Sequence, residues 1–143
     1  LTVHDLRRRI TAEFGQPEDA RTRTNLVSFG YKHGVPGDAD LLFDCRFLPN
    51  PYWDPELRPL TGLDDVVQAY VMDSPLAEEF VNHIQGLLEF LIAAFDEADK
   101  SVMTVAFGCT GGHHRSVTMV ELFAKWLRES GREPNVRHRD VDR

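Results

Sequence analysis

The segment that most constrains the fold is SVMTVAFGCTGGHHRSV, residues 101–117. Its first eight residues are almost all apolar or β-branched, a pattern typical of a strand buried inside a parallel sheet. A cysteine, two glycines and two histidines follow, and a helical pattern begins soon after them. A buried parallel strand that runs through a short turn into a helix needs further parallel strands beside it. The segment therefore predicts an α/β domain.

Strand and helix patterns alternate along the rest of the chain. We predict strands over 25–30, 39–47, 101–108 and 135–141, and helices over 3–14, 64–71, 75–96 and 116–131. The predicted core-facing stripe of the longest helix is Leu76, Phe80, Ile84, Leu87, Leu88, Leu91 and Phe95, and that of the last helix is Val120, Phe123 and Leu127. With no repeat and no internal boundary, residues 1–143 are expected to form a single domain with a mostly parallel sheet of about four strands flanked by helices.

Residues 48–62, LPNPYWDPELRPLTG, contain four prolines in fifteen residues. Proline breaks helices and cannot donate to a strand ladder, so this stretch predicts a long irregular segment. The apolar side chains of Tyr52, Trp53, Leu57 and Leu60 are expected to be buried and to order it.

Charge and cysteine content narrow the classes of function. The net charge of −7 is unfavourable for nucleic-acid binding, and 14 of the acidic residues lie between 38 and 99. Basic residues gather toward the two ends: Arg7, Arg8, Arg9, Arg21, Arg23, Arg132, Arg137, Arg139 and Arg143.

Two cysteines, Cys45 and Cys109, do not make a disulfide framework, and no apolar run suits a membrane span or signal peptide. We expect a reduced, cytoplasmic protein without a cofactor; neighbouring histidines in one loop, with no CxxC or HExxH motif, make a metal site the weaker hypothesis.

The glycine turn after the buried strand is the expected site. Ligands of α/β sheets bind at the carboxyl ends of strands, where the N-terminus of the next helix offers free N–H groups and partial positive charge to an anion. Two glycines allow successive N–H groups to turn toward one point, and an arginine can grip a phosphate with its two-pronged guanidinium. The sequence thus predicts a phosphate-binding loop, with a simple glycine-rich turn as the alternative; the residues are Thr110, Gly111, Gly112, His114, Arg115 and Ser116.

The spacing Cys, five residues, Arg, Ser is also that of cysteine phosphatases. N–H groups beside Arg115 would lower the pKa of the Cys109 thiol and favour a nucleophilic thiolate. However, Gly108 stands where those phosphatases usually carry His, and YWDP does not match their Trp-Pro-Asp acid loop. We interpret Cys109 as a packing residue and the domain as non-catalytic. In the alternative, Cys109 and Arg115 would be the catalytic residues.

Other polar residues follow the first two predicted strands. Lys32 and His33 come after the first, and Asp44 and Arg46 lie at the end of the second. In a parallel sheet these ends would converge on the Cys109 loop, where the cations could meet phosphate and Asp44 could accept from a hydroxyl or an amine.

Four separated motifs, SFGYKHG, DADLLFDCRFLPNP, ELRPLTG and GCTGGHHRSV, occur in this order. Together they closely resemble the carboxyl-terminal half of the RapZ family, the RNase adapter proteins also called the YvcJ family of nucleotide-binding proteins. The resemblance covers essentially the whole chain. Full-length members carry an amino-terminal kinase-like domain with a Walker loop; this sequence has no GxxxxGK[ST], so ATP or GTP binding is not implied.

In that family this half binds glucosamine-6-phosphate and a small regulatory RNA, resembles a phosphofructokinase subdomain and helps the protein oligomerise. The resemblance implies a pocket of Lys32, Thr110, Gly111, His114 and Arg115, with Asp44, Arg46 and Asn50 nearby. The family commonly has Lys at His113 and His at Tyr52, two departures that would weaken phosphate binding or change the sugar. RNA contacts would fall on Arg132, Arg137, His138 and Arg139, although Asp140 and Asp142 among them oppose phosphate contacts.

The leading hypothesis is a non-catalytic sensor of a phosphorylated amino sugar that acts as an adapter toward RNA or protein partners, without membrane association. The alternatives are a cysteine-dependent phosphatase and an RNA-binding module. The resemblance also implies that the chain can form a homo-oligomer.

Overall fold

The computed structural model describes residues 21–143. The predicted helix over 3–14, together with Arg7, Arg8 and Arg9, lies outside the described residues. Of the helices in the described part, none is long and apolar enough to cross a membrane.

Four parallel strands form one sheet: β1 (Arg23–Gly30), β2 (Leu41–Asp44), β3 (Val102–Cys109) and β4 (Asn135–His138). Their order is β2-β3-β1-β4, so the apolar strand β3 lies inside the sheet with seven of its eight residues buried. All three pairings are parallel, which confirms the predicted α/β fold. Gly30 pairs with Cys109, so β1 and β3 end at the same level.

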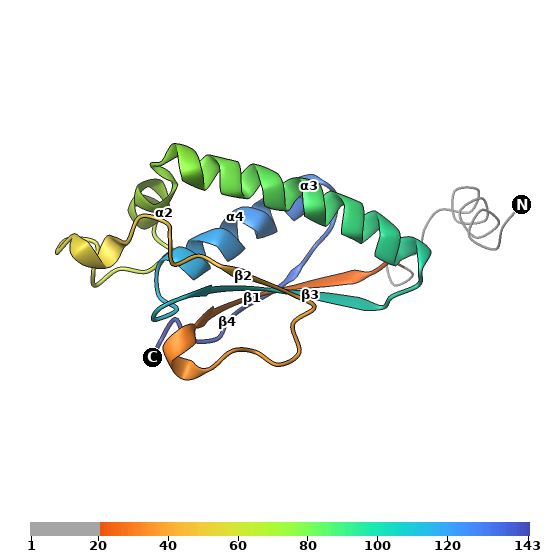
Figure 1. Ribbon diagram of the computed structural model, residues 1–143, viewed down its shortest axis with the longest axis horizontal. Helices are drawn as coiled ribbons and strands as arrows, with labels where there is room; N and C mark the ends of the chain where they lie inside the picture. Colours follow the sequence, from red (N-terminus) through yellow and green to blue (C-terminus); the bar gives the residue numbers. More distant parts are fainter. Residues whose placement is uncertain (1–20) are drawn as a thin grey trace, which may run out of the picture.

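Within residues 21–143 the sheet is joined by three α-helices: α2 (Asp65–Met72), α3 (Pro75–Glu97) and α4 (Arg115–Glu129). Helix α3 begins where the Ser74 hydroxyl accepts the Leu76 N–H and a proline occupies the first turn. Helix α4 ends just before Gly131, whose φ of 86° lies in the left-handed region. Figure 1 shows α3 and α4 on one face of the sheet, with residues 31–40 crossing the opposite face.

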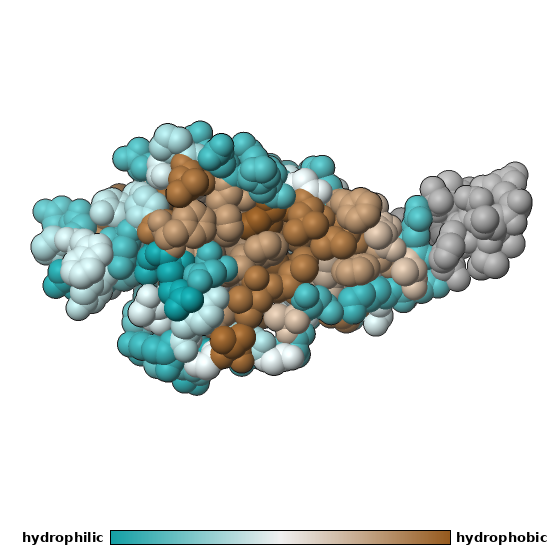
Figure 2. Space-filling view, viewed as in Figure 1, coloured by the Kyte–Doolittle hydropathy of each residue, from teal (hydrophilic) through white to brown (hydrophobic). Residues whose placement is uncertain are grey.

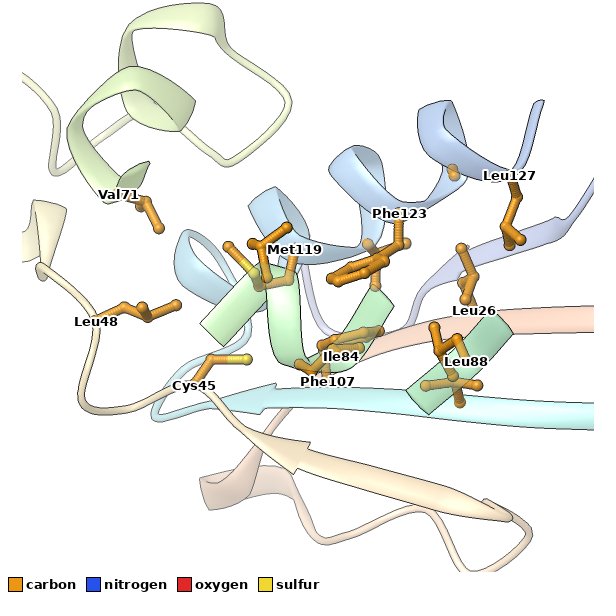
Figure 3. Packing of buried hydrophobic residues seen from close by; sticks show 14 of the residues in the cluster. Leu26, Cys45, Leu48, Val71, Ile84, Leu88, Phe107, Met119, Phe123 and Leu127 are labelled. Carbon is orange, nitrogen blue, oxygen red and sulfur yellow. The ribbon is translucent and has the colours of Figure 1, made fainter. Parts of the chain in front are cut away.

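The core lies between the sheet and these two helices (Figure 3). The rings of Phe107 on β3 and Phe123 on α4 are stacked with their centroids 5.2 Å apart. Ile84 and Leu88 reach the same cluster from α3. As predicted, α4 buries Val120, Phe123 and Leu127, which are at most 1% exposed.

The predicted stripe of α3 is partly wrong. The buried residues are Ala77, Val81, Ile84, Leu88 and Ile92, whereas Leu76 is 53% and Leu87 41% exposed. The helix is apolar over much of its circumference, so periodicity alone does not select the side that packs. The unpacked side contributes to the apolar band over α3 and the edge strand β2 that Figure 2 shows.

Two predicted strands end early because side chains bend the chain into turns. The strand predicted over 39–47 stops at Asp44, whose carboxylate accepts the Arg46 N–H at 2.9 Å. The strand predicted over 135–141 stops at His138, and residues 139–142 turn back toward β1. Gly30 and Asp140 meet there, with the Gly30 N–H 2.7 Å from a carboxylate oxygen.

The segment over 48–62 is irregular, as predicted, apart from the short 3₁₀ helix η3 (Pro51–Trp53). The prediction that its aromatic residues are buried is wrong, because Tyr52 is 51% and Trp53 73% exposed. Leu57 and Leu60 do pack against the core. Hydrogen bonds order other parts of this segment, including one from the Arg58 guanidinium to the Tyr52 carbonyl at 2.7 Å.

Candidate functional site

The predicted ligand residues converge at the carboxyl edge of the sheet. The 3₁₀ helix η2 (Tyr31–His33) follows β1, and the Lys32 N–H donates to the Thr110 carbonyl at 3.3 Å. On the other side of β3, the Cys45 N–H donates to the Gly108 carbonyl at 2.7 Å. The loops after β1, β2 and β3 are therefore fastened to one another, as expected for parallel strands.

Glycine is required where these loops touch. A Cβ on Gly30 would lie 2.4 Å from the Gly111 carbonyl carbon, and one on Gly112 would lie 2.7 Å from the Gly30 nitrogen. Gly112 also has a φ of 80°, a conformation that side chains disfavour. The sequence motif thus serves close backbone packing at these two positions.

The same turn leaves a run of N–H groups free. Within residues 21–143, the main-chain N–H groups of residues 111–117 meet no acceptor. Helix α4 has no side-chain cap: its N-cap is His114, whose side chain points instead to another loop. Free N–H groups at a helix N-terminus favour an anion.

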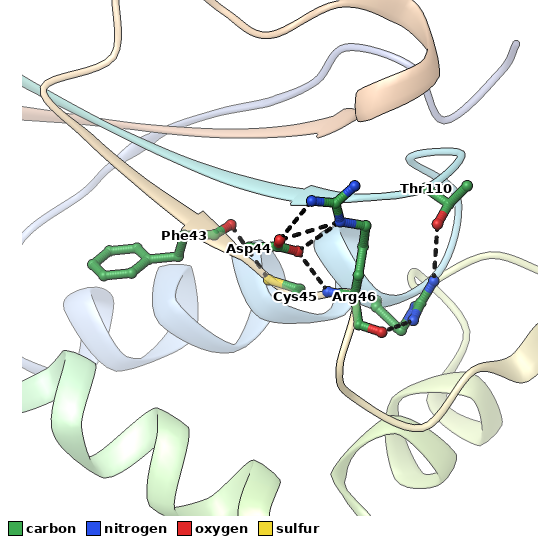
Figure 4. Close-up of polar contacts among 6 residues, drawn as sticks. Phe43, Asp44, Cys45, Arg46 and Thr110 are labelled. Atoms are coloured by element: carbon green, nitrogen blue, oxygen red, sulfur yellow. Dashed lines mark hydrogen bonds and ion pairs between the residues drawn. The ribbon is translucent and has the colours of Figure 1, made fainter.

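Arg115 lies at the start of α4 and is only 5% exposed. Its Nη1 donates to the carbonyls of Arg46 at 2.5 Å and Leu48 at 3.4 Å. Its Nη2 is 3.5 Å from the Thr110 hydroxyl, and Figure 4 draws this contact and the one to the Arg46 carbonyl. All three partners are neutral, and no carboxylate of residues 21–143 forms an ion pair with Arg115.

Asp44 and Arg46, by contrast, are paired with each other. The guanidinium of Arg46 holds the carboxylate in a two-pronged contact, with distances of 3.0 Å and 2.7 Å (Figure 4). This bond from Arg46 keeps the pKa of Asp44 below its ordinary value. The Arg46 guanidinium also lies 3.9 Å from the centre of the Tyr31 ring.

His114 attaches the proline-rich segment to the glycine turn. Its Nε2 lies 2.8 Å from the Leu60 carbonyl and 3.2 Å from the Arg58 carbonyl, so it must carry the proton that is donated to them. Burial lowers the pKa of His114, outweighing the two carbonyl contacts. The structure thus gives His114 an anchoring role that sequence reasoning did not foresee.

The two thiols lie on the buried side of the site. Cys109 is 2% exposed, and its Sγ is 3.1 Å from the Ser116 hydroxyl. Cys45 is fully buried, and burial raises its pKa well above the ordinary range, with a further contribution from Cys109. Both cysteines are free.

The remaining predicted ligand residues lie around the edge of the site. Lys32 is exposed, whereas the His33 Nε2 atom is buried and has no hydrogen-bond partner within the described chain. Asn50 caps η3 by accepting the Tyr52 N–H through its side chain. Among the described residues there is no group of three or more side chains suited to a metal ion.

Three of the four candidate RNA-binding residues are engaged inside the domain. Arg132 pairs with Asp96, and Arg139 pairs with Asp140 at 2.7 Å. The His138 ring lies between the Ser28 hydroxyl at 2.7 Å and the Glu121 carboxylate at 2.9 Å. Arg137 is exposed.

Sequence reasoning missed the Ser28–His138–Glu121 series because its members lie on three different elements. Although it resembles a catalytic triad, Ser28 is fully buried on β1 and offers no surface to a substrate. The series ties β1, β4 and α4 together. Asp140 was treated only as a charge opposing RNA; no sequence signal marks its contact with Gly30.

Fold and site define an α/β domain with a polar, glycine-rich strand-to-helix turn at the carboxyl edge of its sheet. The chain belongs to the RapZ C-terminal domain family, whose model matches residues 22–142. It is 50% identical over 143 residues to a nucleotide-binding protein of Thermobifida fusca. The aligned region covers all of this chain and 49% of that relative. A nucleotide-binding protein of Corynebacterium jeikeium is 46% identical over 142 residues, 99% of this chain and 49% of the relative. The chain thus spans about half the length of these relatives.

Proposed function

We propose that this domain is a non-catalytic sensor of a phosphorylated amino sugar of the glucosamine-6-phosphate class, and that it acts as an adapter toward an RNA or protein partner. The observation that carries this proposal is the state of Arg115. It is a nearly buried guanidinium whose hydrogen-bond partners in the described chain are all neutral.

A buried charge is costly unless an opposite charge or strong hydrogen bonds compensate it. Two carbonyls and a hydroxyl compensate Arg115 in part, and its Nε and one Nη2 hydrogen are left for another acceptor. A phosphate would supply the missing negative charge. It would also accept from the free N–H groups of residues 111–117, which start at the same helix end.

The rest of the ligand can be matched to the edge of the site. Lys32 is exposed there and carries a positive charge for the outer phosphate oxygens. Asp44 keeps exposed carboxylate surface beside Arg46 and could accept from an amino or hydroxyl group of the sugar. The names of the relatives concern nucleotides, but this sequence contains no Walker loop, and a sugar phosphate would fit the same anion site.

The burial of Cys109 supports a binding role over catalysis. A phosphatase nucleophile must reach the phosphorus atom, and this thiol is 2% exposed against Ser116. The phosphatase alternative rests on the Cys-to-Arg spacing. It predicts turnover of a generic phosphoester that Cys109→Ser abolishes, whereas we expect no turnover.

The testing experiment is calorimetry of the domain against glucosamine-6-phosphate, glucosamine and inorganic phosphate. We expect saturable binding of the phosphorylated sugar, weaker binding of phosphate and none of glucosamine. Lys32→Ala should weaken binding without changing the melting temperature, and Lys125→Ala, an exposed lysine on α4, is the matched control. Equal binding of glucosamine and its phosphate would remove the loop from the site.

A further inference from the structure

The segment from Arg139 to Arg143 packs against the side of the glycine turn that faces the loop after β1, called the outer side below. Asp140 is fully buried there. Its carboxylate accepts the Gly30 N–H at 2.7 Å and the Arg139 guanidinium at 2.7 Å, and Arg143 lies 3.3 Å away. A buried carboxylate with one amide and two guanidinium partners is fully compensated.

These contacts reach the anion-binding N–H groups directly. A Cβ on Gly112 would lie 2.9 Å from the Cβ of Asp140, so the turn and the carboxylate side chain are in close contact. The next residue, His113, bonds through Nε2 to the Arg143 main-chain oxygen at 2.6 Å. Arg139 also donates to the Gly34 carbonyl at 2.5 Å, so the loop after β1 is held by the same segment.

We propose that residues 139–143 form a clasp that orients the N–H groups of residues 111–113 for the anion, and that Asp140 is its positioning residue. The proposal rests on the anion site of the proposed function. Arg115 holds the inner side of that site to the loop after β2, and the clasp holds its outer side to the loop after β1. Asp140 touches no ligand and acts through Gly30 and Gly112.

Electrostatics and positioning predict opposite results for Asp140→Asn. Removing a negative charge beside an anion site should tighten binding if charge alone matters. If Asp140 positions the turn, the same change weakens the contacts of Arg139 and Arg143, loosens the turn and weakens binding. Asp142→Asn removes an equal charge from an exposed position in the same segment and is the matched control.

The experiment has two arms on the whole chain. Calorimetry with glucosamine-6-phosphate should give an affinity about tenfold weaker for Asp140→Asn and an equal or slightly tighter affinity for Asp142→Asn, since the charge-assisted hydrogen bonds of Asp140 become weaker neutral ones. Amide hydrogen exchange without ligand should show faster exchange at Gly30 in Asp140→Asn, with unchanged protection in β3.

The two arms separate failure of the clasp from failure of the proposed function. If wild type does not bind the sugar phosphate but Gly30 loses protection, the clasp stands and the proposed ligand is wrong. If Asp140→Asn binds more tightly, or if protection at Gly30 is unchanged, Asp140 is not a positioning residue. A uniform loss of protection across the sheet would show a general structural role and overturn the proposal.

Discussion

Arginines hold the glycine turn on two sides, but their hydrogen-bond partners differ in charge. On the outer side, Arg139 and Arg143 share the buried carboxylate of Asp140. On the inner side, Arg115 is more buried than either of them, yet its partners are two carbonyls and a hydroxyl. Both sides fasten neighbouring loops to the turn, but only the outer arginines form ion pairs with a carboxylate of the described chain.

The difference separates a structural contact from a binding contact. An arginine that already pairs with a carboxylate has less to gain from an anionic ligand, since a negative charge lies beside it. An arginine with neutral partners gains from any anion that can reach it. Under the proposed function, the inner side would therefore supply the binding energy, and the outer side would hold the shape of the turn.

The largest expected effect comes from a change in the turn itself. Gly112→Ala would force a Cβ against Gly30 and Asp140 at a positive φ, and should destabilise the fold by about 3 kcal/mol or more, since strain and steric overlap add. Urea denaturation measures this loss. Gly131→Ala is the control, because it shares the positive φ but has nothing within 4 Å, and should cost about 1–2 kcal/mol. Equal losses for the two variants would show that close packing at Gly112 contributes nothing.

Removing the inner arginine comes next. Arg115→Ala should weaken sugar-phosphate binding about 100-fold, because a charge-assisted, two-pronged contact is lost, and Arg115→Lys should recover only part of it. Calorimetry measures both variants, with Arg128→Ala on the exposed side of α4 as control. Full affinity in Arg115→Lys would show that a point charge is sufficient and that the guanidinium geometry is not used.

A smaller effect concerns pH and the anchoring of the proline-rich segment. The pKa of His114 is lowered by burial, so the native state resists the proton that the unfolded chain accepts. Stability should be complete above the ordinary histidine pKa of about 6.5 and should fall as the pH drops from there toward the lowered native value. His114→Gln, which keeps a side-chain N–H donor, should flatten this part of the pH profile in urea denaturation, whereas His83→Gln at an exposed position should not. An unchanged slope in His114→Gln would contradict the assignment.

The smallest effect is expected at the exposed pair. Asp44→Asn removes one partner of Arg46 at the edge of the site, where solvent screens the interaction, so the melting temperature should hardly change. The freed Arg46 should bind phosphate more strongly, so the affinity for inorganic phosphate should rise slightly. A weaker affinity for glucosamine-6-phosphate together with a stronger one for phosphate would show that Asp44 contacts the sugar.

Much of this fold could be predicted because its signals are local. The apolar run of β3, the Ser74–Pro75 start of α3 and the stop at Gly131 each fix an element through neighbouring residues. The predicted packed side of α3 was wrong at Leu76 and Leu87, because the helix is apolar on both of its sides. The burial of Tyr52 and Trp53 was wrong because hydrogen bonds, which hydropathy does not register, order that loop.

Parts of the candidate site could also be predicted from local patterns, and other parts could not. Order along the chain is enough to place a glycine turn with Thr110, His114 and Arg115 at a strand end. What each side chain does there depends on tertiary contacts: His114 bonds to Leu60, Arg115 to Arg46 and Asp140 to Gly30. These partners lie far apart in the sequence and meet only when the parallel strands align their carboxyl ends. Pairing between distant residues carries no local pattern, so it appears only in the folded chain.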